Sequence, residues 1–218
     1  MRSLLFTTAL ITALSVGSLP GPPSVPGQVR SATADDIAIW RAVATGILQR
    51  PARSASYIVI VSRTGVACPQ YSNRLCMDGR MNGRPFTNLQ AELFDALAAV
   101  FAGVSIDVPD LGDERIRRVS AADLEPLDTE TERVRAEAKA SGAPVHPNLF
   151  WDLFHKRYSG SAGYLVVTAP AYDSARRQAA VHTHFSCGSL CGNGDLYLLS
   201  RSSGGEWTIT ARYPGWVS

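Results

Sequence analysis

The stretch RQAAVHTHFSCGSLCGNGDLYLLSRSSGGEWTITARY, residues 177–213, decides the fold class. It contains three segments rich in β-branched and aromatic residues, at 177–187, 195–201 and 206–213, separated by glycine-rich turns. A fourth segment of the same kind, 163–169, precedes them. Consecutive strands joined by short turns form an antiparallel meander. We therefore predict a four-stranded antiparallel sheet over the last third of the chain.

Side chains in two of these segments alternate between the faces of the predicted sheet. In the segment 177–187, one face carries Ala179, Val181, Thr183 and Phe185, and the other carries Ala180, His182 and His184. In the last segment, one apolar face is expected to carry Trp207, Ile209, Ala211 and Tyr213. We expect Trp207 to be buried in the core.

Helical patterns dominate the chain before residue 160. Residues 35–49 place Ile37, Trp40, Val43 and Ile47 on one stripe, which predicts an amphipathic helix. Residues 57–61, YIVIV, predict a buried strand, and a capping box of Thr87 and Gln90 starts a second helix. Further helices are predicted from Ser120 and over 147–158, and the acids and arginines of 130–140 indicate a solvated helix or a flexible arm. The sequence therefore predicts an α+β fold, with N-terminal helices packed on the C-terminal meander.

The first 34 residues are typical of an export signal. Arg2 precedes an apolar run of about 13 residues, 4–16, which is too short to span a bilayer that needs roughly 20. Cleavage is predicted either after Ser18 or after Ala34, with a proline-rich leader between them. We expect residues 1–34 to be a signal peptide and leader, and 35–218 to be a single domain in the periplasm or secreted. The alternative is an uncut N-terminal membrane anchor; after cleavage, no stable membrane span is expected.

Charge bounds the class of partner. The chain has 21 Lys and Arg and 19 Asp and Glu. Two of the arginines and none of the acids lie in residues 1–34, so residues 35–218 carry 19 of each sign (21 − 2 = 19). A formally neutral domain does not suit a polyanion, which excludes nucleic acid as the expected partner. A small molecule or another protein remains.

The four cysteines predict disulfides. An even number in an exported chain favours oxidised pairs, and four cysteines allow three pairings. The simplest joins Cys68 to Cys76 and Cys187 to Cys191, each within one short loop. The second bond would staple a glycine-rich turn between two strands.

The same turn also allows two other interpretations. The pattern H-x-H-x-x-C-x-x-x-C could supply a tetrahedral zinc site from His182, His184, Cys187 and Cys191. A redox role for the two cysteines is weakened by the C-x-x-x-C spacing and by the absence of a following helix that would lower a thiol pKa.

Catalytic motifs are missing from the sequence. It contains no G-x-S-x-G, H-E-x-x-H, P-loop or G-x-G-x-x-G, and nothing in it implies a cofactor. The available acid/base groups are His182 or His184, with Asp195 or Asp152 as partner; Asp152 could also pair with His155, three residues along its helix.

The leading hypothesis is a disulfide-stabilised binding or interaction domain. The rival is a small enzyme with His182 and His184 in a deep pocket.

Motifs over the last third of the chain resemble a known group. They are W-x-x-F-x-x-x-Y-x-x-S-x-G from Trp151 to Gly163, C-G-x-L-C-G-x-G from Cys187 to Gly194, G-x-W-x-I from Gly205, and a final Trp-Val-Ser. This pattern resembles a group of uncharacterised exported bacterial proteins, which implies the fold and the location but no activity. The order of elements is also similar to the cystatin-like and nuclear-transport-factor-like folds. That likeness implies a pocket between sheet and helices, used by enzymes and binding modules alike.

Overall fold

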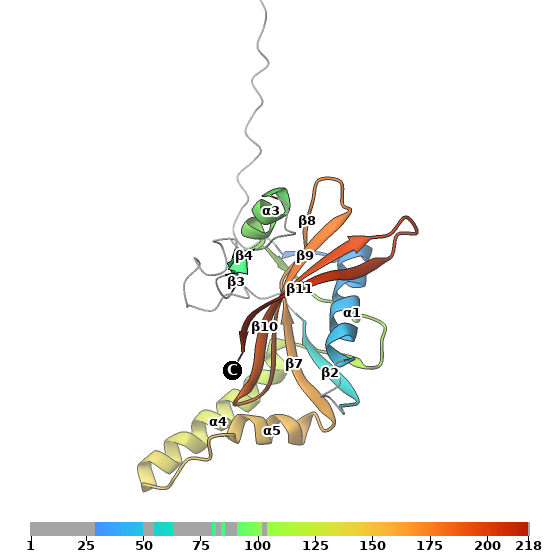
Figure 1. The fold of residues 1–218 in the computed structure, drawn as a ribbon. Helices are drawn as coiled ribbons and strands as arrows, with labels where there is room; N and C mark the ends of the chain where they lie inside the picture. The colour runs from blue at the N-terminus through green and yellow to red at the C-terminus, as the bar shows by residue number, and fades with distance from the viewer. Residues whose placement is uncertain are drawn as a thin grey trace, which may run out of the picture.

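The computed structural model describes residues 29–49, 55–62, 80–81, 84–85, 91–101 and 104–217 (Figure 1). Its helices are α1 (Ala34–Leu48), α3 (Ala91–Phe101), α4 (Ala121–Ser141) and α5 (Leu149–Arg157). The main sheet contains β2 (Tyr57–Val61), β6 (Ile116–Val119), β7 (Ser161–Val167), β8 (Ala171–Tyr172), β9 (Gln178–Gly188), β10 (Cys191–Arg201) and β11 (Trp207–Val217). Two short pairs lie apart from it, β1 (Val29–Arg30) with β5 (Ser105–Ile106) and β3 (Arg80–Met81) with β4 (Arg84–Pro85).

The main sheet confirms the α+β class and corrects its architecture. It has seven strands in the order β11-β10-β9-β7-β2-β6, with β8 paired to β9. The strands from β7 to β11 are antiparallel, as predicted, but β2 runs parallel to both β7 and β6. The prediction of a four-stranded meander was therefore wrong in extent. The residue patterns that predict strands span only neighbouring residues. The pairing of β2 with β6 and β7, in contrast, joins segments about 55 and 100 residues away along the chain.

Helix α1 covers one face of the sheet. It begins with a capping box in which Thr33 and Asp36 each bond the backbone of the other, so the free amides of the first turn are satisfied. Its buried stripe, which includes Trp40, packs in the main core with the apolar side chains of β2, β7 and β9. The indole of Trp40 also donates to the carbonyl oxygen of Thr168 at 3.0 Å. These contacts orient α1 along the sheet.

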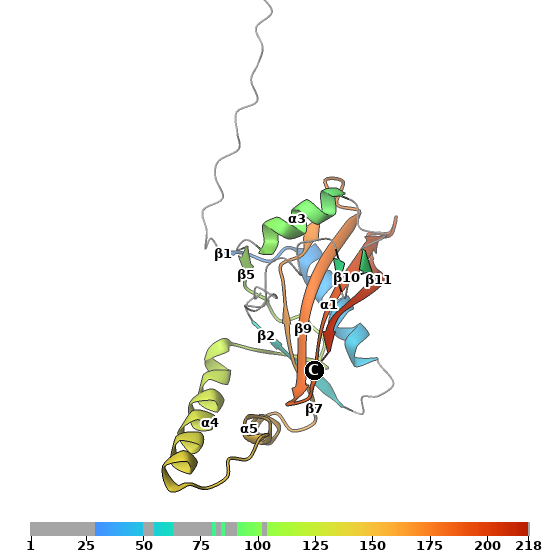
Figure 2. The ribbon, with the colours of Figure 1, turned by 60° about the vertical axis from the view of Figure 1, so that its left-hand side comes forward.

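Helices α3, α4 and α5 lie on the opposite face, α3 at one end and the α4–α5 pair at the other (Figure 2). A second, smaller core forms under α5 from Tyr57, Val59, Val119, Leu127 and Phe154. Ser120 caps α4 with a second capping box, which confirms the predicted start. The predicted solvated segment is the outer part of α4, where Arg133 bonds Glu130 and Glu137 in solvent. Among the described residues, no helix combines the length and the apolar character needed to cross a bilayer.

A β-bulge changes the faces of β11. Leu199 pairs with Ile209, but its neighbour Leu198 pairs with Ala211, so the chain carries one extra residue between them. Ile209 and Ala211 therefore face opposite sides of the sheet, and the predicted common face for them was wrong. The predicted burial of Trp207 is confirmed, and its indole donates to Asp35 of α1 at 3.2 Å.

Candidate functional site

The two histidines of β9 share one face of the sheet, as the alternation predicted, and the structure shows that this face is the one opposite α1. His182 is 3 % exposed and meets the ring of Phe101, at the end of α3, edge to face with centroids 5.9 Å apart. Within the described part of the chain, nothing hydrogen-bonds its Nδ1 atom. Burial lowers the pKa of His182 to about 4 and also lowers that of His184. Both rings are therefore neutral at neutral pH, and the Nε2 atom of His184 lies 3.0 Å from the hydroxyl of Ser186.

Asp195 does not join the histidines. It pairs across the sheet with Thr183, and His182 pairs with Leu196. Because side chains directly opposite each other share a face, the carboxylate of Asp195 lies on the α1 side of the sheet and both rings lie on the other side. The charge of Asp195 raises the pKa of His182 but is outweighed by burial, which lowers it. The predicted acid/base pair of a histidine with Asp195 is thus not assembled by this register.

Asp195 instead anchors a buried polar network. Its side chain is fully buried, and Arg212 of β11 grips it with Nε 2.9 Å from Oδ2 and Nη2 3.0 Å from Oδ1. Asn193 donates to Oδ2, and the hydroxyl of Tyr197 lies 3.5 Å from the same atom. A carboxylate removed from water needs such partners, which accounts for the polar side chains in this part of the sheet. Strict alternation from Trp207 would put Arg212 on the opposite face from Asp195, and only the bulge in β11 brings the two side chains to the same face.

Asp152 and His155 are likewise separated. The carboxylate of Asp152 lies 2.8 Å from Nδ1 of His146, in the connection between α4 and α5. The ring of His155 instead lies against Trp151, with centroids 5.8 Å apart. Both members of the Asp152–His146 pair are largely exposed, and water screens such a pair strongly.

The disulfide between Cys187 and Cys191 confirms the predicted local staple. Their Cα atoms are 5.0 Å apart, and the bond closes the β9–β10 hairpin. Sulfur atoms in a disulfide provide no thiolate, so the zinc set of His182, His184, Cys187 and Cys191 is not assembled. Cys68 and Cys76 lie outside the described residues. Across the ranges that the structure describes, no three His, Cys, Asp or Glu side chains are grouped to hold a metal ion.

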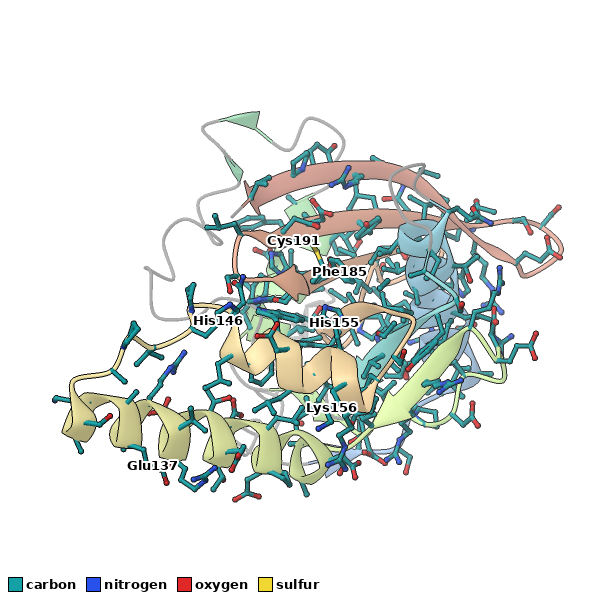
Figure 3. The ribbon with its side chains drawn as sticks, turned by 90° about the horizontal axis from the view of Figure 1, so that it is seen from below. Glu137, His146, His155, Lys156, Phe185 and Cys191 are labelled. Carbon is teal, nitrogen blue, oxygen red and sulfur yellow. A yellow bond between two sulfur atoms is a disulfide. The ribbon has the colours of Figure 1, made fainter. Side chains whose placement is uncertain are left out.

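The stapled hairpin ends in an exposed apolar tip. Leu190 is 88 % exposed, the highest value among the large hydrophobic residues described, and Val217, paired with Asn193, is 79 % exposed. The hydroxyl of Ser189 donates to the carbonyl oxygen of Pro147 at 3.4 Å, which sets the α4–α5 connection beside the tip. Figure 3 shows Cys191 and His146 together at this end of the molecule, with Glu137 farther out on α4. We define the hairpin tip as residues 186–194, a run without a charged residue.

A shallow depression of about 600 Å³ lies elsewhere, against β6. Its lining is mostly charged, from Asp110, Asp113, Glu114, Arg117 and Arg118. Two of these charges are already paired, Asp113 with Arg115 and Arg118 with Asp107. None of the residues selected from the sequence lines this depression.

Comparisons of the chain with protein-family models, with curated proteins and with solved structures give no match.

Burial of His182 makes stability pH-dependent. The unfolded chain takes up a proton near the ordinary pKa of about 6.5, whereas the folded chain takes it up only near 4. The stabilisation is fully present above pH 6.5 and is lost as the pH falls towards 4. We expect His182 to account for a loss of about 3 kcal/mol between about pH 7 and about pH 4.

Urea unfolding of the wild type and of His182→Phe at these two pH values checks this expectation. The substitution keeps a planar ring but removes the proton site, so its stability should fall by about 3 kcal/mol less than that of the wild type. Equal losses in the two proteins would show that His182 does not titrate in this way.

Proposed function

We propose that the protein is an exported, disulfide-stapled interaction domain that docks a partner protein on its hairpin tip. The observation that carries the proposal is the exposure of Leu190 at the end of a covalently closed turn. An exposed large apolar side chain indicates an interaction site when further exposed apolar side chains lie near it. Val217 and the 39 %-exposed Val145 belong to the strand and the connection beside the tip.

The shape and chemistry of the tip favour a protein over other partners. Residues 189–191, at the end of the hairpin, are all exposed, so they do not enclose a small molecule as a pocket does. The uncharged run 186–194 offers nothing to a phosphate or another ion. Stable binding to a lipid surface needs a larger apolar segment or basic residues beside it, and the run 186–194 has neither. An apolar socket on a protein, rimmed by hydrogen-bonding groups, fits an exposed leucine that follows the polar side chain of Ser189.

The disulfide has a clear role in such a complex. A turn that is ordered before binding loses less conformational entropy when it docks. The bond between Cys187 and Cys191 and the contact of Ser189 with Pro147 both hold the tip in one position. The same disulfide supports the proposed export, because disulfides persist in oxidising compartments.

Site-specific photo-crosslinking in the native host tests the proposal. We expect p-benzoylphenylalanine in place of Leu190 to give one adduct of discrete mass, and the same group in place of Ser203 to give none. Ser203 is the matched control because it is exposed on the β10–β11 turn, at the other end of the strands. Val217→Asp should remove the adduct.

Three outcomes would contradict docking on a partner. They are no adduct from position 190, the same adduct from positions 190 and 203, and an adduct with twice the mass of the chain. The last result would identify a second copy of this chain as the occupant.

The rival hypothesis of a pocket enzyme keeps one supporting observation. The Nδ1 atom of His182 is buried and, among the described residues, has no hydrogen-bond partner. A substrate hydroxyl or a water molecule would satisfy it. Asp195 lies on the other face, so such an enzyme would need a different acid/base partner for His182. Loss of turnover of a panel of ester and glycoside substrates in His182→Phe would support this rival, and absence of turnover in the wild type would reject it for those substrates.

A further inference from the structure

The residues just before the predicted domain boundary at residue 35 already belong to the fold. β1 pairs in parallel with β5, with Val29 opposite Ser105 and Arg30 opposite Ile106. Thr33 is the N-cap of α1, and its side chain accepts a hydrogen bond from the backbone amide of Asp36 at 3.2 Å. Residues 29–33 therefore connect the start of α1 to β5, a segment about 70 residues further along the chain.

Asp36 depends on these residues. It is fully buried, and Arg30 donates to it from Nη1 at 2.7 Å and from Nη2 at 3.2 Å. Thr33 donates to its Oδ2 twice more, from the backbone amide at 2.7 Å and from Oγ1 at 2.8 Å. The hydroxyl of Tyr172, on β8, donates to Oδ1 at 2.7 Å. Four of these five bonds come from Arg30 and Thr33.

The electrostatics show the same dependence. Burial alone would raise the pKa of Asp36, but the hydrogen bonds from Arg30, Thr33 and Tyr172 outweigh it, and the pKa is lowered. The carboxylate is thus held as an anion inside the protein. Without Arg30 and Thr33, the bond from Tyr172 is the one that remains among those made by the described residues. A buried anion without its cation is strongly destabilising.

Two cleavage sites are available in the sequence, after Ser18 and after Ala34. A cut after Ala34 would remove β1, the N-cap and four of the five bonds to Asp36. We propose that the leader is cleaved before residue 29, at the site after Ser18, and that residues 29–34 stay in the mature protein as part of its fold. This inference rests on the proposed export of the chain.

The first test follows the processing of the full chain in its host by intact mass. Cleavage requires a small residue at its N-terminal side, so Ser18→Glu should accumulate precursor and Ala34→Glu should mature like the wild type. Ala34 is exposed in the first turn of α1, where an acidic side chain is favourable, so Ala34→Glu does not disturb the fold.

The outcomes separate the two proposals. A mature chain that starts between residues 17 and 28 supports the inference, and one that starts at residue 35 overturns it while leaving export intact. A protein that retains Met1 would overturn cleavage and, with it, the proposed export through a cleaved signal.

A second test does not depend on export. In the full chain, Arg30→Ala with Thr33→Ala should lower the melting temperature by about 8 °C, and adding Asp36→Asn should restore part of it by removing the unpaired charge. Arg133→Ala is the control: it removes two exposed ion pairs on α4 and should leave the melting temperature unchanged. An unchanged melting temperature in the double variant would show that residues 29–34 are dispensable and would overturn the inference.

Discussion

Replacing Gly163 with alanine is expected to lower the free energy of unfolding by about 4 kcal/mol, a large part of the roughly 5–15 kcal/mol that stabilises a typical folded protein. Gly163 lies in β7 with a φ of 128°, a conformation that side chains rarely adopt. A Cβ atom there would collide with the backbone carbonyl oxygen of Ser186 and would lie 2.9 Å from the Cα atom of Cys187. The backbone of β9 cannot shift locally as a flexible side chain could, because its hydrogen bonds hold it in the sheet. The new Cβ atom would therefore fit only if β7 and β9 moved apart.

Urea unfolding followed by circular dichroism measures this effect. Gly204→Ala is the matched control, because the nearest atom to its new Cβ would be the hydroxyl of Ser202 at an ordinary 3.6 Å. The control should change stability by less than about 1 kcal/mol. A Gly163→Ala protein as stable as the control would mean that β7 and β9 do not approach this closely.

Arg212→Ala is expected to lower the free energy of unfolding by about 3 kcal/mol. The cost comes from the partner that stays behind, since the carboxylate of Asp195 would remain inside the sheet without the guanidinium that binds it, while Asn193 and Tyr197 stay in place. Asp195 is fully buried and cannot turn to water, unlike Arg212, whose side chain is partly exposed.

The double variant Arg212→Ala with Asp195→Asn separates this explanation from a general loss of packing. Asparagine keeps the shape and removes the charge, so the double variant should recover at least about half of the lost stability. Arg115→Ala serves as the control, because its ion pair with Asp113 is at the surface and should be worth less than about 1 kcal/mol. If the double variant were as unstable as Arg212→Ala alone, the buried carboxylate of Asp195 would not be the cause.

Local patterns in the sequence predicted the elements close to their observed bounds. The stripe from Ile37 to Ile47 predicted α1, YIVIV predicted β2 at its observed bounds, and Ser120 predicted the start of α4. The alternation in residues 177–187 correctly put His182 and His184 on one face of β9. The predicted staple of Cys187 to Cys191 is also local, because a bond across a short turn depends on few residues.

Residue periodicity determines which side chains share a face within one strand, and nothing more. Which strand lies beside it, and in what register, depends on contacts between residues far apart along the chain. The tertiary structure therefore decided that β2 lies between β6 and β7, and that a bulge in β11 turns Ile209 and Ala211 to opposite faces. The register of β10 against β9 put Asp195 opposite Thr183 and thus away from His182.

The N-terminal region shows the same contrast between local residue patterns and contacts between distant residues. The sequence by itself predicts an apolar leader and two sites at which it could be cut, since both predictions rest on short local patterns. Only the tertiary structure showed that Arg30 reaches a buried Asp36, because the burial of that carboxylate comes from packing against β8, more than 130 residues away. A charged residue in the first turn of a helix is common, and its need for a cation appears only when the folded chain excludes water from it.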